Sequence, residues 1–178
     1  MESPTLERRR FLRTALGSGA AVIGAGALPR ASAASETGDA FAFEITRSDA
    51  DWRARLSEAE YRVLRKHLTE LPHSSPLAKE TRAGIYCCKG CDLTIYDSTW
   101  KVPLDIGWVF FSHSEPRTVL TSIDGDPPEG MGDEEGPGAM VEVHCRRCAS
   151  HLGHIVLAEG KLVHCINGTA LTFIRSGA

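Results

Sequence analysis

The chain has 178 residues, with 20 basic and 23 acidic side chains and a formal net charge of −3. This length accommodates one domain of ordinary size and an additional segment. The slightly acidic balance argues against a nucleic-acid partner, because such binding depends on a concentrated basic face that neutralises phosphates. We therefore expect no nucleic-acid binding.

Residues 1–33 have the form of an export signal. The basic run RRRFLR at residues 8–13 precedes a charge-free stretch at 14–29, and ASA at 31–33 fits a signal peptidase site. The run resembles the twin-arginine signal, which is an address read by a receptor. The alternative, a permanent membrane anchor, needs about 18 or more strongly apolar residues, and this stretch is short, rich in Gly and Ala, and interrupted by Pro29. We expect twin-arginine export to a periplasmic or extracytoplasmic location, with no stable membrane anchor.

All six cysteines lie beyond the signal. Five arginines and two glutamates lie within residues 1–33, so the remaining chain has a formal charge of −6 in place of −3. An even cysteine count in an exported protein suggests disulfides. However, Cys88 and Cys91, like Cys145 and Cys148, form C-x-x-C pairs, and four thiolates suit a closed tetrahedral zinc site with a structural role. No thioredoxin-like pattern surrounds either pair, which disfavours redox chemistry there.

The chain after the signal is predicted to contain a linker and entry segment at 34–50 and a folded domain at 51–178. Residues 41–45 could add an edge strand. Ser57 and Glu60 form a capping-box pattern, and apolar residues then recur at helical spacing, which predicts an amphipathic helix over 58–68. A long loop rich in Gly, Pro and acidic residues is expected at 124–138.

Short apolar or alternating runs, mostly bounded by turn residues, predict strands through the rest of the domain. The predicted strands are 84–88, 93–96, 108–111, 118–122, 139–144, 155–157, 162–166 and 170–174. Short strands preceded by one helix favour a mainly β fold, either a β-sandwich or a partly open barrel.

Cys165 and Cys87 are the cysteines outside the two pairs. Neighbouring strand residues point to opposite faces, so Cys87 is expected to be a buried small hydrophobe and not a ligand beside Cys88. Cys165 could be inert, paired with Cys87, or reactive. Nearby histidines favour reactivity, because a thiol nucleophile needs a lowered pKa and a proton donor for its leaving group.

Four motifs in order are similar to the signature of the B-type methionine sulfoxide reductases. They are GIYCCKGC at 84–91, DIGW at 105–108, EVHCRRCASHLGH at 142–154 and HCINGTALTF at 164–173. The resemblance covers about residues 52–173. It implies a zinc-bearing β-sandwich of two antiparallel sheets, and an oxidoreductase that reduces the R epimer of methionine sulfoxide, mainly in oxidised proteins or peptides.

The resemblance also implies individual roles. Cys165 matches the family's nucleophile, which would become a sulfenic acid and be recycled by a thioredoxin-like or other thiol reductant. His151 and His154 match the histidines that bind and protonate the sulfoxide oxygen, and Asn167 matches a polar group near the nucleophile. The zinc ligands would be Cys88, Cys91, Cys145 and Cys148. Substrate would be bound by Trp108, as an aromatic wall, and by Phe111.

Several positions differ from the family pattern. The arginine usual two residues before the nucleophile is Val163, and Trp108 is followed by Val109 and Phe110 where proline and serine are usual. Ile106 stands where many members have a resolving cysteine, and the connection from His154 to Cys165 is shorter than usual. Two alternatives stay open, and the differences at Val163, Val109 and the short connection motivate the first. One is a diverged, catalytically weak binding module on the same scaffold. The other is a metalloenzyme in which His151, His154 and Cys165 hold a second metal.

Overall fold

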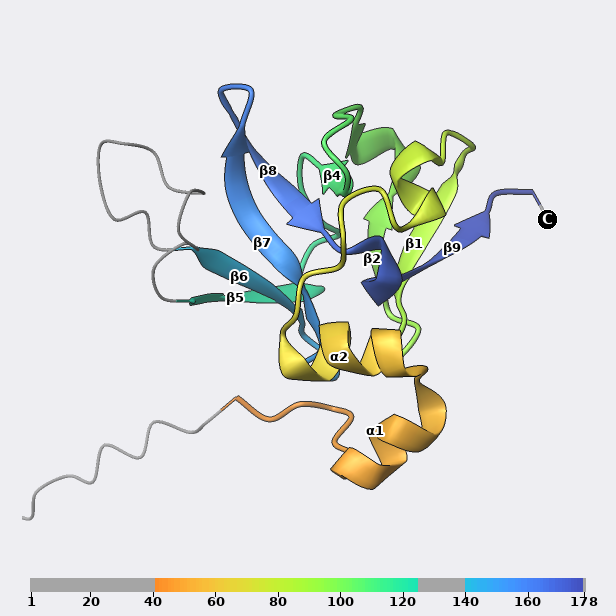
Figure 1. Ribbon diagram of the computed structural model, residues 1–178, viewed down its shortest axis with the longest axis vertical. Coiled ribbons are helices and arrows are strands. Elements are labelled where there is room, and N and C mark those ends of the chain that lie inside the picture. Colours follow the sequence, from red (N-terminus) through yellow and green to blue (C-terminus); the bar gives the residue numbers. More distant parts are fainter. Residues whose placement is uncertain (1–40, 125–139, 178) are drawn as a thin grey trace, which may run out of the picture. The chain divides into compact units, whose positions relative to one another are not determined.

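The computed structural model describes residues 41–124 and 140–177 (Figure 1). The predicted export signal, residues 34–40 of the predicted linker and all but the first residue of the loop predicted at 124–138 lie outside the described residues. Within these ranges, no helix is both long and apolar enough to cross a membrane.

Two short helices precede the sheets, and both begin at a capping box. Helix α2 spans Glu58–Lys66, and its Ser57 and Glu60 cap the first turn as predicted. It ends two residues earlier than expected because His67 adopts the left-handed conformation, with φ of 56°. Helix α1, Asp49–Arg55, was not predicted as a helix, although Ser48 and Asp51 carry the same capping signal.

The strands form two antiparallel sheets, which confirms the predicted fold class. The smaller sheet has the order β2 (Thr94–Asp97), β1 (Gly84–Cys88) and β9 (Leu171–Arg175). The larger has the order β3 (Lys101–Val102), β4 (Val109–Phe111), β8 (Lys161–Ile166), β7 (His151–Ala158), β6 (Val141–Cys145) and β5 (Val119–Ile123).

Aromatic side chains from both sheets form the centre of the core. The Phe111 ring from the larger sheet stacks on Tyr96 at 4.1 Å and meets Tyr86 edge-on at 5.0 Å, and both tyrosines belong to the smaller sheet. All three side chains are fully buried. Leu64 of α2 adds to the same core, and Figure 1 shows this helix beneath the ends of the sheets. Burying aromatic area between two sheets is the main stabilising contribution expected here.

Most predicted strands lie within one or two residues of the observed ones, with three differences. Strand β7 runs over His151–Ala158 and not only over 155–157, so both histidines are strand residues. Strand β3 was not predicted. Residues 41–45 form no strand, and Ile45 makes a single backbone hydrogen bond, from its N–H to the Arg147 carbonyl at 3.0 Å.

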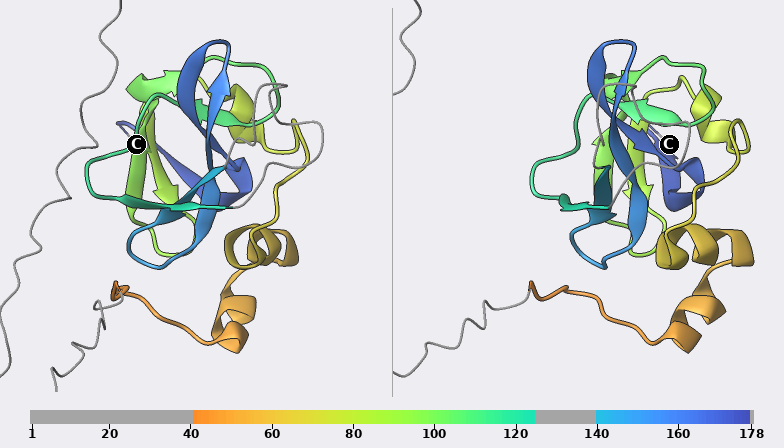
Figure 2. Two further views of the ribbon diagram at one scale, coloured as in Figure 1. Left: turned by 90° about the vertical axis from the view of Figure 1, so that its left-hand side faces the viewer. Right: turned by 60° about the vertical axis from the view of Figure 1, so that its left-hand side comes forward.

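The β7–β8 hairpin fixes the register near Cys165. Its two turn residues, Glu159 and Gly160, have φ of 48° and 73°, the positive values that suit the right-handed twist of paired strands. From this turn the pairing runs without interruption to His154 opposite Cys165. The hairpin is the long projecting pair in Figure 2. The short connection therefore places His154 beside the thiol.

Candidate active site and metal centre

The two C-x-x-C pairs meet in one buried cluster. The sulfurs of Cys88 and Cys148 lie 3.8 Å apart and those of Cys91 and Cys145 lie 3.5 Å apart. All four sulfurs lie within 4.8 Å of one another, and all six cysteines of the chain are free thiols. A disulfide would bring two sulfurs to about 2.05 Å. The spacing fits a tetrahedral ion instead, because metal–sulfur bonds of about 2.3 Å place ligand sulfurs about 3.8 Å apart.

The two turns that present these sulfurs have the same local geometry. The residue after each second cysteine, Asp92 or Ala149, has φ near 60°. In each turn its N–H donates to the carbonyl of the first cysteine, at 2.8 Å and 2.9 Å. The Ser150 hydroxyl lies 3.2 Å from the Cys148 sulfur. The backbone thus holds four sulfur donors in place, and the donor set fits a structural metal ion with no open position.

Cys165 lies in the middle of a row of paired residues across the larger sheet. Its Cα is paired with Phe110 on β4 and with His154 on β7. Directly opposed residues point to the same face of a sheet, so the thiol lies between an aromatic ring and an imidazole. Gly153 permits this pairing, because a Cβ there would lie 2.1 Å from the Cys165 carbonyl oxygen.

The surroundings of Cys165 are largely apolar. The thiol packs with a small cluster centred on Phe110, Ala158 and Val163, to which Trp108 also belongs. Burial raises the pKa of Cys165 to about 12, and the negative charge of Glu70 adds to the rise. Val163 offers no positive charge to offset this. The resting thiol is therefore protonated at neutral pH.

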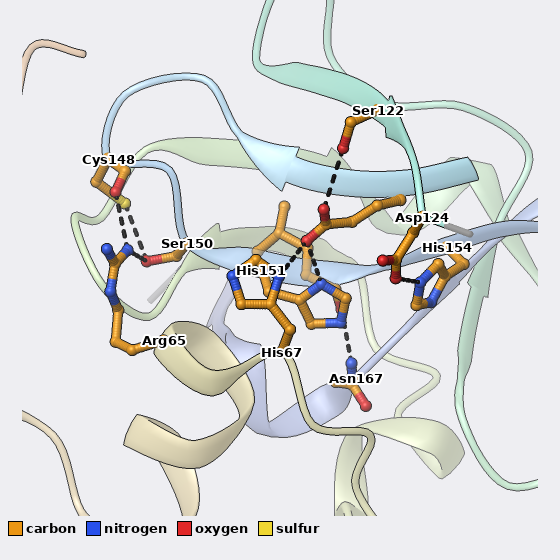
Figure 3. A network of polar contacts seen from close by, with 11 residues as sticks. Arg65, His67, Ser122, Asp124, Cys148, Ser150, His151, His154 and Asn167 are labelled. Atoms are coloured by element: carbon orange, nitrogen blue, oxygen red, sulfur yellow. Dashed lines mark hydrogen bonds and ion pairs between the residues drawn. The ribbon is translucent and has the colours of Figure 1, made fainter. Parts of the chain in front are cut away.

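The two histidines of β7 are each held by a carboxylate (Figure 3). His151 is fully buried, and its Nδ1 lies 2.7 Å from Glu142 Oε1. His154 Nε2 lies 2.9 Å from Asp124 Oδ2. The two imidazoles meet edge-on with ring centroids 5.2 Å apart. His151 Nε2 is buried and has no hydrogen-bond partner among the described residues, so it can donate to a ligand oxygen when the ring carries its second proton.

Burial and charge shift the pKa values of Glu142 and His151 in opposite directions. Burial raises the pKa of Glu142, but the hydrogen bond and charge of His151, the charge of His67 and the Ser122 hydroxyl together lower it below its usual value. Burial lowers the pKa of His151, against the hydrogen bond and charge of Glu142. Glu142 is thus a carboxylate that accepts from His151 Nδ1–H.

Glu70 connects the remaining predicted site residues. Its buried carboxylate accepts the Gly168 and Thr169 N–H groups at 2.7 Å and 2.8 Å. Its own N–H donates to Asn167 Oδ1 at 3.0 Å, and its carbonyl accepts the Trp108 indole N–H at 3.2 Å. One residue therefore positions the predicted aromatic wall, the predicted polar group and the turn that follows Cys165.

The structure separates one predicted residue from this group. Phe111 was expected to bind substrate, but its ring is fully buried in the core against Tyr96, while Cys165 belongs to the other cluster. The reason is strand alternation: Phe110 and Phe111 point to opposite faces of the sheet, and Phe110 is the one paired with Cys165.

The alternative second metal site is likewise not formed by the expected residues. Among the described residues, His151, His154 and Cys165 do not gather as a ligand group, whereas His67, Glu142 and His151 do. His67, Glu142 and Glu70 were not predicted as site residues from the sequence. Glu142 lies within the EVHC motif and Glu70 follows the predicted helix, and these positions gave only a weak indication of a role in the site. Their roles become clear from the tertiary contacts.

Comparison with known proteins agrees with this arrangement. Residues 56–175 match the SelR domain family model. The chain is 34% identical to peptide methionine sulfoxide reductase MsrB of Agrobacterium fabrum over 135 residues, covering 73% of this chain and 93% of that protein. It is 35% identical to peptide methionine sulfoxide reductase B5 of Oryza sativa subsp. japonica over 132 residues, covering 71% and 89%. It is 31% identical to peptide methionine sulfoxide reductase B3 of Arabidopsis thaliana over 134 residues, covering 72% and 70%.

Among solved structures, the Mis18 'Yippee-like' domain aligns with a TM-score of 0.44 at 15% identity, covering 55% of this chain and all of that one. The chain belongs to the SelR domain family of B-type peptide methionine sulfoxide reductases.

Proposed function

We propose that this protein reduces methionine sulfoxide to methionine, with Cys165 as the nucleophile. The observation that carries the proposal is the register of β8, which sets the Cys165 thiol between Phe110 and His154. An apolar wall beside a thiol and a histidine suits a substrate with a methyl group and a sulfoxide oxygen. The named relatives support the same activity.

The reaction follows from these groups. The Cys165 sulfur attacks the sulfoxide sulfur while an imidazole N–H supplies a proton to the oxygen, which otherwise leaves poorly. The oxygen passes to Cys165, which becomes a sulfenic acid, and the substrate leaves as the thioether. An external thiol then forms a mixed disulfide with Cys165 and releases water. A second thiol releases the free Cys165 thiol and an external disulfide.

His151 is the better placed proton donor in this scheme. Its Nε2 is buried and meets no partner in the part of the chain that the structure describes, whereas His154 Nε2 is already held by Asp124. His154, which is paired with Cys165 across the β7–β8 hairpin, is the proposed acceptor for the proton of the resting thiol. This division explains how a thiol with a raised pKa can react: its proton leaves to one histidine while the other donates.

The finer parts of the proposal rest on the sequence and the family. We propose the R epimer of methionine sulfoxide in oxidised proteins or peptides as the substrate and a thioredoxin-like or other thiol as the reductant. Zinc is the proposed ion of the four-cysteine cluster, where it would tie the β1–β2 end of one sheet to β6 of the other. Export by the twin-arginine route is proposed from residues 8–13.

A steady-state assay tests the activity. The protein is given dithiothreitol and a peptide carrying either epimer of methionine sulfoxide, and the remaining epimer is measured by chiral chromatography. We expect loss of the R epimer alone, and no loss with Cys165→Ser. Cys87→Ser is the matched control, because Cys87 packs beside Thr94 in the smaller sheet. Turnover that survives Cys165→Ser would contradict the proposal.

A second candidate is a catalytically weak binding module on the same scaffold. The raised pKa of Cys165 and the apolar Val163 favour it, because both reduce the thiolate available for attack. This candidate predicts that the protein binds an oxidised peptide with full metal content but reduces neither epimer.

A further inference from the structure

One oxygen atom of Glu142 holds two histidines. His151 Nδ1 lies 2.7 Å from Oε1, and His67 Nδ1 lies 2.9 Å from the same atom (Figure 3). The other oxygen, Oε2, accepts the Ser122 hydroxyl at 3.1 Å. Each distance is that of a hydrogen bond to a carboxylate. His151 therefore shares the Glu142 carboxylate with His67.

The two histidines differ in their access to water. His151 and Glu142 are buried, with side chains 0% and 8% exposed, whereas the His67 side chain is 52% exposed. The imidazole rings lie side by side, with centroids 5.4 Å apart and a tilt of 30°. His67 thus connects solvent to a buried carboxylate that supports the proposed proton donor.

We propose that His67 is a positioning residue that competes with His151 for the Glu142 carboxylate and so sets the pH range over which His151 carries its second proton. This inference rests on the proposed function for its effect on turnover, but not for its effect on His151 itself. Two protonated imidazoles cannot both draw full support from one carboxylate oxygen, so their protonations oppose each other.

The direction of the effect follows from the groups that surround His151. Burial lowers the pKa of His151 most, Glu142 raises it, and the charges of His154 and His67 lower it further. His144 of β6 is paired opposite His151, and the Asp124 carboxylate lies 2.9 Å from Nε2 of His154. Removing His67 removes a like charge and a competing donor, so the pKa of His151 rises. His151 then keeps its proton to higher pH.

His67→Gly isolates this effect because residue 67 ends α2 with φ of 56°, a conformation that glycine adopts without strain. His73→Gly is a closely matched control. His73 also has a positive φ, 60°, and its side chain is 51% exposed, but its Nδ1 lies 3.6 Å from Asp105 and not at Glu142. Glu142→Gln is expected to change the pKa of His151 in the opposite direction, because it removes the carboxylate that raises this pKa.

The test is an NMR titration of the His151 ring in the wild-type protein and the three variants, without substrate. We expect the His151 midpoint to rise by about half a pH unit or more in His67→Gly, to stay unchanged in His73→Gly, and to fall in Glu142→Gln. The alkaline limb of kcat/KM is expected to move in the same directions. An unchanged or lowered midpoint in His67→Gly would overturn the inference whatever the turnover. Failure of the wild-type protein to reduce sulfoxide would count against the proposed function alone, because the titration is read without turnover.

Discussion

Replacing Glu70 with glutamine should weaken the fold and quicken the reactions of the thiol at the same time. The Glu70 carboxylate accepts the N–H groups of Gly168 and Thr169 at 2.7 Å and 2.8 Å in a buried position. Glutamine keeps one acceptor oxygen and turns an NH₂ group toward the second N–H, which leaves that N–H unsatisfied. A buried unsatisfied donor costs about 1–3 kcal/mol, and the remaining bond loses the strength of its charge.

We therefore expect Glu70→Gln to lower the free energy of unfolding by about 2–4 kcal/mol in a urea titration. Glu58→Gln is the control, because that side chain is 72% exposed and lies no closer than 3.6 Å to Arg53. Exposed carboxylates of this kind contribute little, about 0–1 kcal/mol. Equal stability of the two variants would refute the assigned role of Glu70.

The reactivity of the Cys165 thiol provides a second measurement on Glu70→Gln, and here we expect an increase where stability decreases. The charge of Glu70 adds to the burial that raises the pKa of Cys165, so its removal should lower that pKa and move the pH midpoint of iodoacetamide alkylation downward. Turnover should nevertheless fall, because the Gly168–Thr169 turn after Cys165 loses its carboxylate acceptor, while the backbone contacts of residue 70 with Trp108 and Asn167 remain. A more reactive thiol in a slower enzyme would separate the positioning of this turn from the activation of Cys165. An unchanged alkylation midpoint would show that the charge of Glu70 does not reach the sulfur.

Three other outcomes follow from the same contacts. In a Cys87→Ser background, the rate at which Cys165 is alkylated should increase with pH, with a midpoint near pH 12 and not near the ordinary pKa of 9. The raised pKa also means that this thiol's contribution to stability is complete below pH 9 and is lost as pH rises through 12. Metal analysis should find one ion per chain. Cys145→Ser should abolish metal binding and leave the protein unfolded by circular dichroism, because structural zinc contributes about 10–16 kcal/mol in small domains. A variant that keeps its fold without metal would argue against a structural ion. Gly153→Ala should lower the melting temperature and kcat/KM together, since a Cβ would lie 2.1 Å from the Cys165 carbonyl oxygen; a variant with wild-type activity would refute the close approach.

The parts of the fold that follow from local pattern could be predicted from the sequence. The capping box at Ser57 and Glu60 located the start of α2, and alternating apolar runs located most strands. The two C-x-x-C pairs predicted a joint cluster although more than 50 residues separate them, since ligand spacing is a local signal. Helix α1 was not predicted although Ser48 and Asp51 form a capping box, because few apolar residues follow this capping box within the helix.

The parts that depend on tertiary contacts could not be predicted in this way. Nothing local indicates that Glu70 reaches the turn after Cys165, or that His67 shares Glu142 with His151, because Glu70 and His67 lie far from these partners in the chain. The placement of Phe111 depends on tertiary contacts in the same way. Only the register with Cys165 shows that Phe110, and not Phe111, is the residue on the thiol's face.

A single-turnover experiment tests the central claim most directly. The metal-loaded protein, in a Cys87→Ser background and without any reductant, is mixed with an excess of a peptide carrying the R epimer of methionine sulfoxide, and dimedone is added to trap sulfenic acid. We predict one thioether per protein chain and one dimedone adduct at Cys165, found by peptide mass mapping. A folded, metal-loaded protein that forms no thioether, or that forms it with the adduct elsewhere than Cys165, would contradict the account.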